Sequence, residues 1–90
     1  MYYCKYYVYA LSSTVKNYIY VGLTKNVKKR AKQHNSGENR TTRRYKPFTI
    51  ILTEEFDTRP DARKREKYLK SGVGKEFLKS LPGTPVSRNW

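Results

Sequence analysis

Two short segments near the start of the chain favour β-strands. Residues 3–11, YCKYYVYAL, and residues 18–22, YIYVG, are rich in aromatic and β-branched side chains, and only the polar stretch SSTVKN separates them. The pattern predicts an antiparallel hairpin. Because successive side chains of a strand point to opposite faces, the hairpin should present one aliphatic face and one tyrosine-rich face. The core face should carry Val8, Ala10, Ile19 and Val21, and the other face Tyr7, Tyr9, Leu11, Tyr18, Tyr20 and Gly22.

A helix is predicted from about residue 25 to 36. Thr24 is a suitable N-cap, and the pattern ends at the SGE that follows. Val27 and Ala31 are four residues apart, which places them on one face of this helix. Residues 38–46, ENRTTRRYK, show no periodicity and predict a basic loop.

One further strand and two helices are predicted after that loop. Residues 48–56, FTIILTEEF, predict a third strand; residues 57–72, DTRPDARKREKYLKSG, predict a helix that closes at Gly72; and a short helix should lie between Gly74 and Pro82. The order ββαβαα indicates an α+β fold, a small three-stranded antiparallel sheet flanked by helices. We expect one domain, residues 1–82, and a tail, residues 83–90. The alternating residues of the third strand are Phe48, Ile50 and Leu52, and the contacts of the last helix are Phe77, Leu78 and Leu81.

The charge balance points to a polyanionic partner. Twenty Lys and Arg against seven Asp and Glu give a formal charge of +13 on 90 residues, which favours nucleic acid ahead of acidic lipid. We expect DNA, with RNA as the alternative. The single cysteine allows no intrachain disulfide, and the absence of a signal-like or long apolar stretch predicts a soluble cytoplasmic protein without a membrane partner.

The basic charge is densest between Lys25 and Lys46, where Glu38 is the only acid. Such residues usually contact phosphates or are simply solvated. The predicted nucleic-acid contacts are Lys25, Lys28, Lys29, Arg40, Arg43, Arg44 and Lys46.

Glu66 occupies an unusual place in the second predicted helix. Ala62 lies four residues before it and Leu69 three after it, so the carboxylate falls on the stripe that should turn inward. A bare buried carboxylate is costly, and a divalent metal or a cluster of cations would offset that cost. Alternatively, the helix is rotated and Glu66 pairs with Lys70 across solvent.

Arg30 and His34 are also four residues apart and project from one face of the first helix. A single histidine is more often structural than catalytic. The chain contains no HExxH, no Cys/His set, no phosphate-cradling glycine loop and no Gly-x-Ser-x-Gly elbow. These residues alone therefore do not define an enzyme.

Four blocks taken in order resemble the GIY-YIG nuclease domain in its compact stand-alone form. The blocks are YVY, residues 7–9; YVG, residues 20–22; KKRAKQHNSG, residues 28–37; and ARKREKYLKSG, residues 62–72. The resemblance extends from about residue 5 to 79.

The resemblance implies a role for each matching residue. Tyr9 and Tyr20 match the two motif tyrosines, which in the family activate or position the attacking water. Arg30 matches the arginine that contacts the scissile phosphate. His34 matches a histidine that is present in part of the family, where it can assist the proton transfer of the tyrosine. Glu66 matches the glutamate that ligates one Mg²⁺ or Mn²⁺. A phenol is a poor base at neutral pH, so we expect Arg30, His34 and the metal to favour a Tyr9 phenolate.

The sequence departs from the family pattern at three places. Tyr7 replaces a common glycine. Leu23 stands where some relatives have a lysine, for which Lys25 is a possible substitute. The stretch EFLKSL, residues 76–81, lacks an asparagine that some relatives have there.

These observations predict a metal-dependent endonuclease that hydrolyses DNA phosphodiester bonds, selects its substrate by structure and serves a process such as DNA repair. Two other hypotheses remain. One is a catalytically weak or inactive nucleic-acid-binding module on the same fold, and the other is a basic protein associated with RNA or the ribosome.

Overall fold

The first strand is the central strand of the sheet. The computed structural model describes residues 5–81. Strand β1 (Tyr6–Ser13) pairs antiparallel with β2 (Ile19–Thr24) on one side and with β3 (Phe48–Phe56) on the other, so the strand order is β2-β1-β3. This sheet and the order of its elements confirm the predicted α+β fold.

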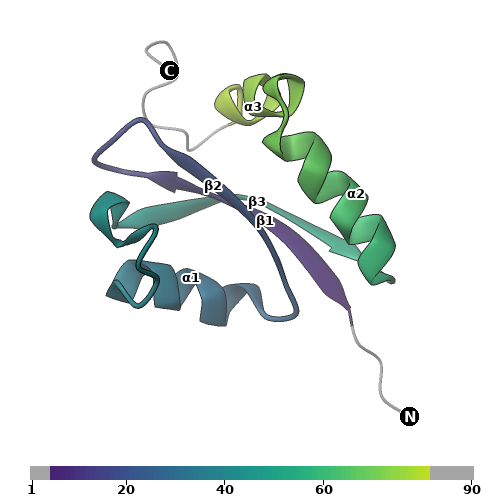
Figure 1. Ribbon diagram of the computed structural model, residues 1–90, viewed down its shortest axis with the longest axis horizontal. Coiled ribbons are helices and arrows are strands. Elements are labelled where there is room, and N and C mark those ends of the chain that lie inside the picture. The colour runs from purple at the N-terminus through teal and green to yellow at the C-terminus, as the bar shows by residue number, and fades with distance from the viewer. Residues whose placement is uncertain (1–4, 82–90) are drawn as a thin grey trace.

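Helices cover both faces of the sheet. Helix α1 (Val27–Ser36) lies on one face, and α2 (Arg59–Lys70) and α3 (Gly72–Lys79) lie on the other (Figure 1). The tyrosine-rich face is therefore a second buried layer and not an open surface. Tyr9, in the middle of that face, has no exposed area.

The predicted alternation of side chains in the hairpin is confirmed by two separate apolar clusters. One lies between the sheet and α2–α3, and the other between the sheet and α1. Burying both faces suits a chain this small, which must use every apolar side chain to form a core. The first cluster contains Val8, Ala10, Val21, Ala62, Leu69 and Leu78, and the second contains Tyr9, Leu11, Ala31 and Phe48.

Strand β3 does not alternate regularly. Ala10 is opposite Leu52 and Leu11 is opposite Ile50, so Ile51 has no partner in the register between them. Such an extra residue is a β-bulge, which changes the face to which the following side chains point. Ile51 and Leu52 both pack towards α2, whereas Ile50 is 43% exposed. Phe48 and Ile50 share a face, as predicted, since they are opposite Ser13 and Leu11, but the prediction that Leu52 lies on that face is wrong.

Helix α1 begins two residues later than predicted. Its N-cap is Asn26, whose Oδ1 accepts a hydrogen bond from the backbone N–H of Lys29 at 3.0 Å, so the predicted Thr24 cap is wrong. Thr24 instead accepts a hydrogen bond from the N–H of Asn26. The helix ends at Gly37, whose φ of 84° is in the left-handed region that glycine tolerates.

Helices α2 and α3 meet at Ser71. The Oγ of Ser71 accepts a hydrogen bond from the N–H of Gly74 and caps α3, so α2 ends before Gly72 and α3 begins there. Of the predicted contacts of this helix, Leu78 is fully buried and Leu81 packs against the core. Phe77 is 36% exposed, with the guanidinium of Arg65 5.6 Å from its ring centroid.

The basic segment contains one short helix, η1 (Arg43–Tyr45), where a loop was predicted. The predicted tail, residues 83–90, and the predicted start of the first strand at residue 3 lie outside the described residues. Among residues 5–81, no helix has the length and apolar character needed to cross a bilayer.

Candidate active site

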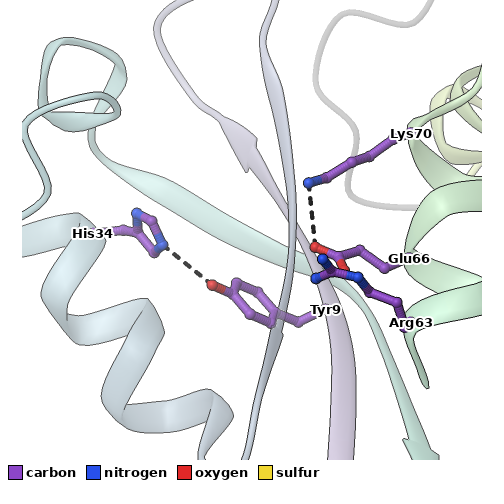
Figure 2. Close-up of polar contacts among 5 residues, drawn as sticks. All are labelled: Tyr9, His34, Arg63, Glu66 and Lys70. Atoms are coloured by element: carbon purple, nitrogen blue, oxygen red, sulfur yellow. Dashed lines mark hydrogen bonds and ion pairs between the residues drawn. The ribbon is translucent and has the colours of Figure 1, made fainter. Parts of the chain in front are cut away.

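Tyr9 extends from β1 towards α1 and meets His34. The Tyr9 Oη lies 3.3 Å from the His34 Nε2 (Figure 2). On the neighbouring strand, Gly22 is paired with Tyr9, and a Cβ at Gly22 would lie 2.6 Å from that Oη. A real Cβ is not found this close to another atom, so the glycine of the YVG block makes room for the phenol.

His34 is held from both ring nitrogens. Its side chain is 1% exposed, and its Nδ1 lies 2.7 Å from the Oγ1 of Thr42, which is completely buried. Sequence patterns did not reveal Thr42, because the segment around it has no periodicity. Only the turn of the chain after α1 brings this hydroxyl back to the histidine.

Tyr20 and Arg30 complete this cluster. The Tyr20 ring centroid is 4.6 Å from that of His34 and 6.1 Å from that of Tyr9. Arg30 is partly exposed, and its Nη1 donates a hydrogen bond to the Oε1 of Gln33 at 3.2 Å. Arg30 and His34 line a cavity of about 190 Å³ together with Gln33, Glu38 and Asn39, so this side of the cluster borders an open space, whereas Tyr9 has no exposed area.

Burial is the largest cause of the pKa shifts of Tyr9 and His34. It raises the pKa of the Tyr9 hydroxyl, and the nearby Arg30 guanidinium only partly opposes this effect. Burial also lowers the pKa of His34, and the positive charge of Arg30 lowers it further. Tyr9 is therefore a neutral phenol and His34 a neutral imidazole at pH 7. Arg30 lowers the pKa of Tyr9, as expected, but burial raises it by more, so Arg30 and His34 by themselves do not make Tyr9 a phenolate.

Glu66 faces inward from α2, as its position on the helix predicts. The residue is 8% exposed, and its two oxygens lie 3.4 Å from the Arg63 Nη1 and 3.2 Å from the Lys70 Nζ (Figure 2). The alternative of a Glu66–Lys70 pair is also correct in part. The pair forms, but the helix is not rotated and the carboxylate is not in solvent.

Glu66 belongs to the layer opposite Tyr9. Its helix neighbours Ala62 and Leu69 pack in the α2–α3 cluster, whereas Tyr9 packs in the α1 cluster, and Figure 2 shows strands between the two groups. The structure thus brings Tyr9, Tyr20, Arg30 and His34 together and leaves Glu66 apart. Around the free edge of β2 the two sides approach each other, because Tyr20 and Lys70 line one cavity.

The side chains around Glu66 are compatible with a single hard cation. Among residues 5–81 no group of three or more His, Cys, Asp or Glu side chains is placed to hold a metal. Mg²⁺, however, is commonly bound by one or two carboxylates together with waters and substrate phosphates. The side chains of Arg63 and Lys70 are 58% and 56% exposed, so both can swing away from the carboxylate when a cation replaces them.

All the residues predicted to contact nucleic acid are exposed. They lie before α1, on α1, and in and around η1, and the Lys25 Nζ is 5.6 Å from the ring centroid of Tyr6. Their positions leave them accessible to a polyanion. These residues are Lys25, Lys28, Lys29, Arg40, Arg43, Arg44 and Lys46.

Residues 5–78 match the family model of the GIY-YIG catalytic domain. The chain therefore belongs to the GIY-YIG family, whose domains are nucleases. It is 36% identical to a UPF0213 protein of Cupriavidus necator over 86 residues, covering 91% of this chain and 92% of the relative. A UPF0213 protein of Natronomonas pharaonis is 39% identical over 66 residues, 72% of this chain and 76% of the relative.

The fold also matches an experimental structure. The solution NMR structure of a UPF0213 protein from Bacillus halodurans superposes with a TM-score of 0.53 at 36% identity, covering 90% of this chain and 88% of that one. The relatives are thus small proteins of similar length that consist of this domain.

Proposed function

We propose that the protein is a metal-dependent endonuclease that hydrolyses phosphodiester bonds of DNA and selects its substrate by structure. The observation that carries this proposal is the buried contact between the Tyr9 Oη and the His34 Nε2, with His34 and Arg30 in the wall of an open cavity. A tyrosine needed only for packing does not require a glycine opposite it and a neutral histidine at its hydroxyl.

His34 is proposed to receive the proton of the Tyr9 hydroxyl. A neutral imidazole that donates from Nδ1 to the Thr42 Oγ1 has a free lone pair at Nε2, so it can accept a hydrogen bond from the phenol. As a water attacks phosphorus, its proton passes to the Tyr9 oxygen while the phenolic proton moves to His34, and the bond from phosphorus to the leaving oxygen breaks, with the leaving oxygen keeping its electron pair. The phenol therefore acts as a relay and need not be ionised beforehand.

Arg30 is proposed to bind the scissile phosphate. Its side chain is partly exposed at the mouth of the cavity, and its guanidinium stays charged at any physiological pH. A fixed cation at this position stabilises the negative charge that develops on the phosphoryl oxygens.

Glu66 is proposed as the one protein ligand of a Mg²⁺ or Mn²⁺ ion. When bound, such an ion supplies Lewis-acid stabilisation of a phosphoryl or leaving oxygen. The buried carboxylate supports this role, because its partners Arg63 and Lys70 are exposed surface side chains. The exposed basic residues from Lys25 to Lys46 would bind the DNA backbone on either side of the cleaved bond. The protein would act in the cytoplasm, for example in DNA repair.

The position of Glu66 also favours a second candidate function. Glu66 lies in the layer opposite Tyr9 and is already paired with two cations. A domain whose metal site is remote from its tyrosines would bind nucleic acid and cleave it slowly or not at all.

A cleavage assay separates the two candidates. Flap, branched, nicked and plain duplex DNA, with matching RNA, are incubated with the wild-type protein in the presence of Mg²⁺, Mn²⁺ or EDTA. The nuclease proposal expects cuts that need the metal and fall mainly on one class of DNA structure. Binding without cleavage under all conditions supports the second candidate and overturns the first.

A further inference from the structure

A groove outside the predicted basic segment runs along the β2 edge of the sheet, where no strand of residues 5–81 pairs. Strand β2 is an edge strand, and two adjoining cavities of about 350 Å³ and 240 Å³ lie between it and the end of α2 and α3. They share Tyr18, Ile19 and Lys75 and therefore adjoin, and we call the two together the β2-edge groove. It is lined by Asn17, Tyr18, Ile19, Tyr20, Val21, Lys70, Lys75, Leu78 and Lys79.

The charge of the β2-edge groove has one sign. Its lining includes Lys70, Lys75 and Lys79 but no acidic residue. Within residues 5–81, Lys70 pairs with Glu66 and Lys79 with Glu76, whereas no carboxylate of that part of the chain lies within ion-pair distance of Lys75. Three lysines along a groove with tyrosine and aliphatic walls form a complementary surface for an anionic chain that also has apolar faces.

The groove leads to the candidate active site. Tyr20 lines it and also contacts His34 through its ring, and Lys70 connects it to Glu66. A strand that lies in the groove therefore passes between the tyrosine cluster and the carboxylate, around the edge of β2.

We propose that the β2-edge groove binds a single-stranded segment of the nucleic-acid substrate. The inference rests on the proposed function only where it links the groove to cleavage, since binding in the groove does not require cleavage. Unpaired bases can lie against the tyrosine and aliphatic walls of the groove while their phosphates meet its lysines, whereas the bases of a duplex are already stacked on one another. The substrate class is thus DNA with a single-stranded tail or gap beside the cleaved bond.

The first test is direct mapping by NMR without metal. A short single-stranded oligodeoxynucleotide is titrated into the wild-type protein, and a duplex of equal length is the control. The amide signals of Tyr18–Val21 and Lys75–Lys79 should shift with the single strand and shift much less with the duplex. Equal shifts with both ligands, or shifts confined to residues 25–46, would overturn the proposal.

The second test uses charge reversal with a matched control. The double variant Lys75→Glu, Lys79→Glu should bind the single strand about tenfold or more weakly, because each substitution removes a charge-assisted hydrogen bond. The slope of log affinity against log salt should fall by about 0.7 for each phosphate that the variant no longer neutralises. The double variant Lys64→Glu, Lys67→Glu makes the same change of net charge on the exposed side of α2 and should bind nearly as the wild type does. Equally weakened binding by the two variants would show a general charge effect and contradict the groove.

Cleavage data then separate this proposal from the nuclease proposal. If the Lys75/Lys79 variant loses single-strand binding but no protein cuts any substrate, the groove is supported and the nuclease proposal fails. If the wild type cuts, and the variant has the same ratio of cleavage rates on tailed and nicked substrates as the wild type, the nuclease proposal stands and the groove proposal is wrong.

Discussion

The hydroxyl of Tyr9 lies 3.3 Å from the Nε2 of His34 at the centre of a buried layer, although the two residues are 25 positions apart in the sequence. Both groups are neutral at pH 7, because burial raises the pKa of Tyr9 and lowers that of His34. The pair therefore has the protonation states that the proposed relay requires, in which the phenol donates to the imidazole.

The first prediction concerns the phenol. Tyr9→Phe removes one hydroxyl and keeps the ring, so we expect the cleavage rate to fall about 100-fold or more while the fold is retained. Tyr18→Phe is the control, since it keeps the ring that stacks on Tyr45 at 4.0 Å and forms part of the wall of the β2-edge groove, and it removes a hydroxyl outside the Tyr9–His34 contact. Single-turnover rates on the preferred substrate measure both. Equal rates for Tyr9→Phe and wild type would make Tyr9 a packing residue.

The second prediction concerns folding stability and pH. The pKa of His34 is lower in the folded state than its value of about 6.5 in the unfolded chain, so the unfolded state takes up a proton first as the pH falls. The free energy of unfolding should therefore be constant above about pH 7.5 and decrease as the pH falls below about 6.5. Urea unfolding at a series of pH values from 8 to 5 measures this free energy. His34→Gln should flatten this part of the curve, and an unchanged slope would contradict the lowered pKa.

The third prediction concerns Thr42, which positions His34 and does not touch the substrate. Thr42→Val removes the hydroxyl 2.7 Å from Nδ1, so the imidazole loses its fixed orientation and we expect the rate to fall roughly tenfold. The acid limb of the pH–rate profile should move to lower pH, because the threonine oxygen stabilises the charged imidazolium more than the neutral ring. Thr42→Ser should restore both the rate and the position of the acid limb. Thr41→Val, at the exposed neighbouring position, is the control. A slower Thr42→Val with an unchanged pH profile would indicate a merely structural role.

The fourth prediction concerns Gly22. In Gly22→Ala the added methyl group meets the Tyr9 ring, with 2.6 Å to its Oη, so the phenol must move away from His34. We expect activity to fall about as far as in Tyr9→Phe, and the free energy of unfolding to decrease by about 1–3 kcal/mol. Gly72→Ala is the control, because a Cβ there meets no atom within 4 Å. If Gly22→Ala is as active and stable as the wild type, Tyr9 does not need its observed position.

The fifth prediction concerns Glu66. Glu66→Gln keeps the shape of the side chain but removes its charge, so it should abolish both metal binding measured by calorimetry and metal-dependent cleavage. DNA affinity should stay the same or rise, because Arg63 and Lys70 are released from the carboxylate. Glu55→Gln, whose side chain is 53% exposed, should bind metal and cleave as the wild type does. Unimpaired metal binding by Glu66→Gln would place the metal elsewhere.

The local features of this protein follow from its sequence alone. Period-2 alternation predicts Val8 and Ala10 on one face of the sheet and Tyr9 on the other, and the structure has them there. Helical spacing predicts Ala62 and Glu66 on one buried stripe, and both are buried. These features depend only on residues that are a few positions apart. The regular backbone of a strand or a helix sets the direction of each side chain, whatever the rest of the chain does.

The contacts between distant segments depend instead on the packing of the whole chain. The bulge at Ile51 depends on how β3 fits β1, and the Thr42–His34 contact depends on the path of the chain after α1. The separation of Glu66 from Tyr9 depends on which face of the sheet each helix covers. A sequence period gives the direction of a side chain relative to its own element. The partner that it meets follows from the packing of elements, which is set by the summed burial of many residues and not by any local pattern.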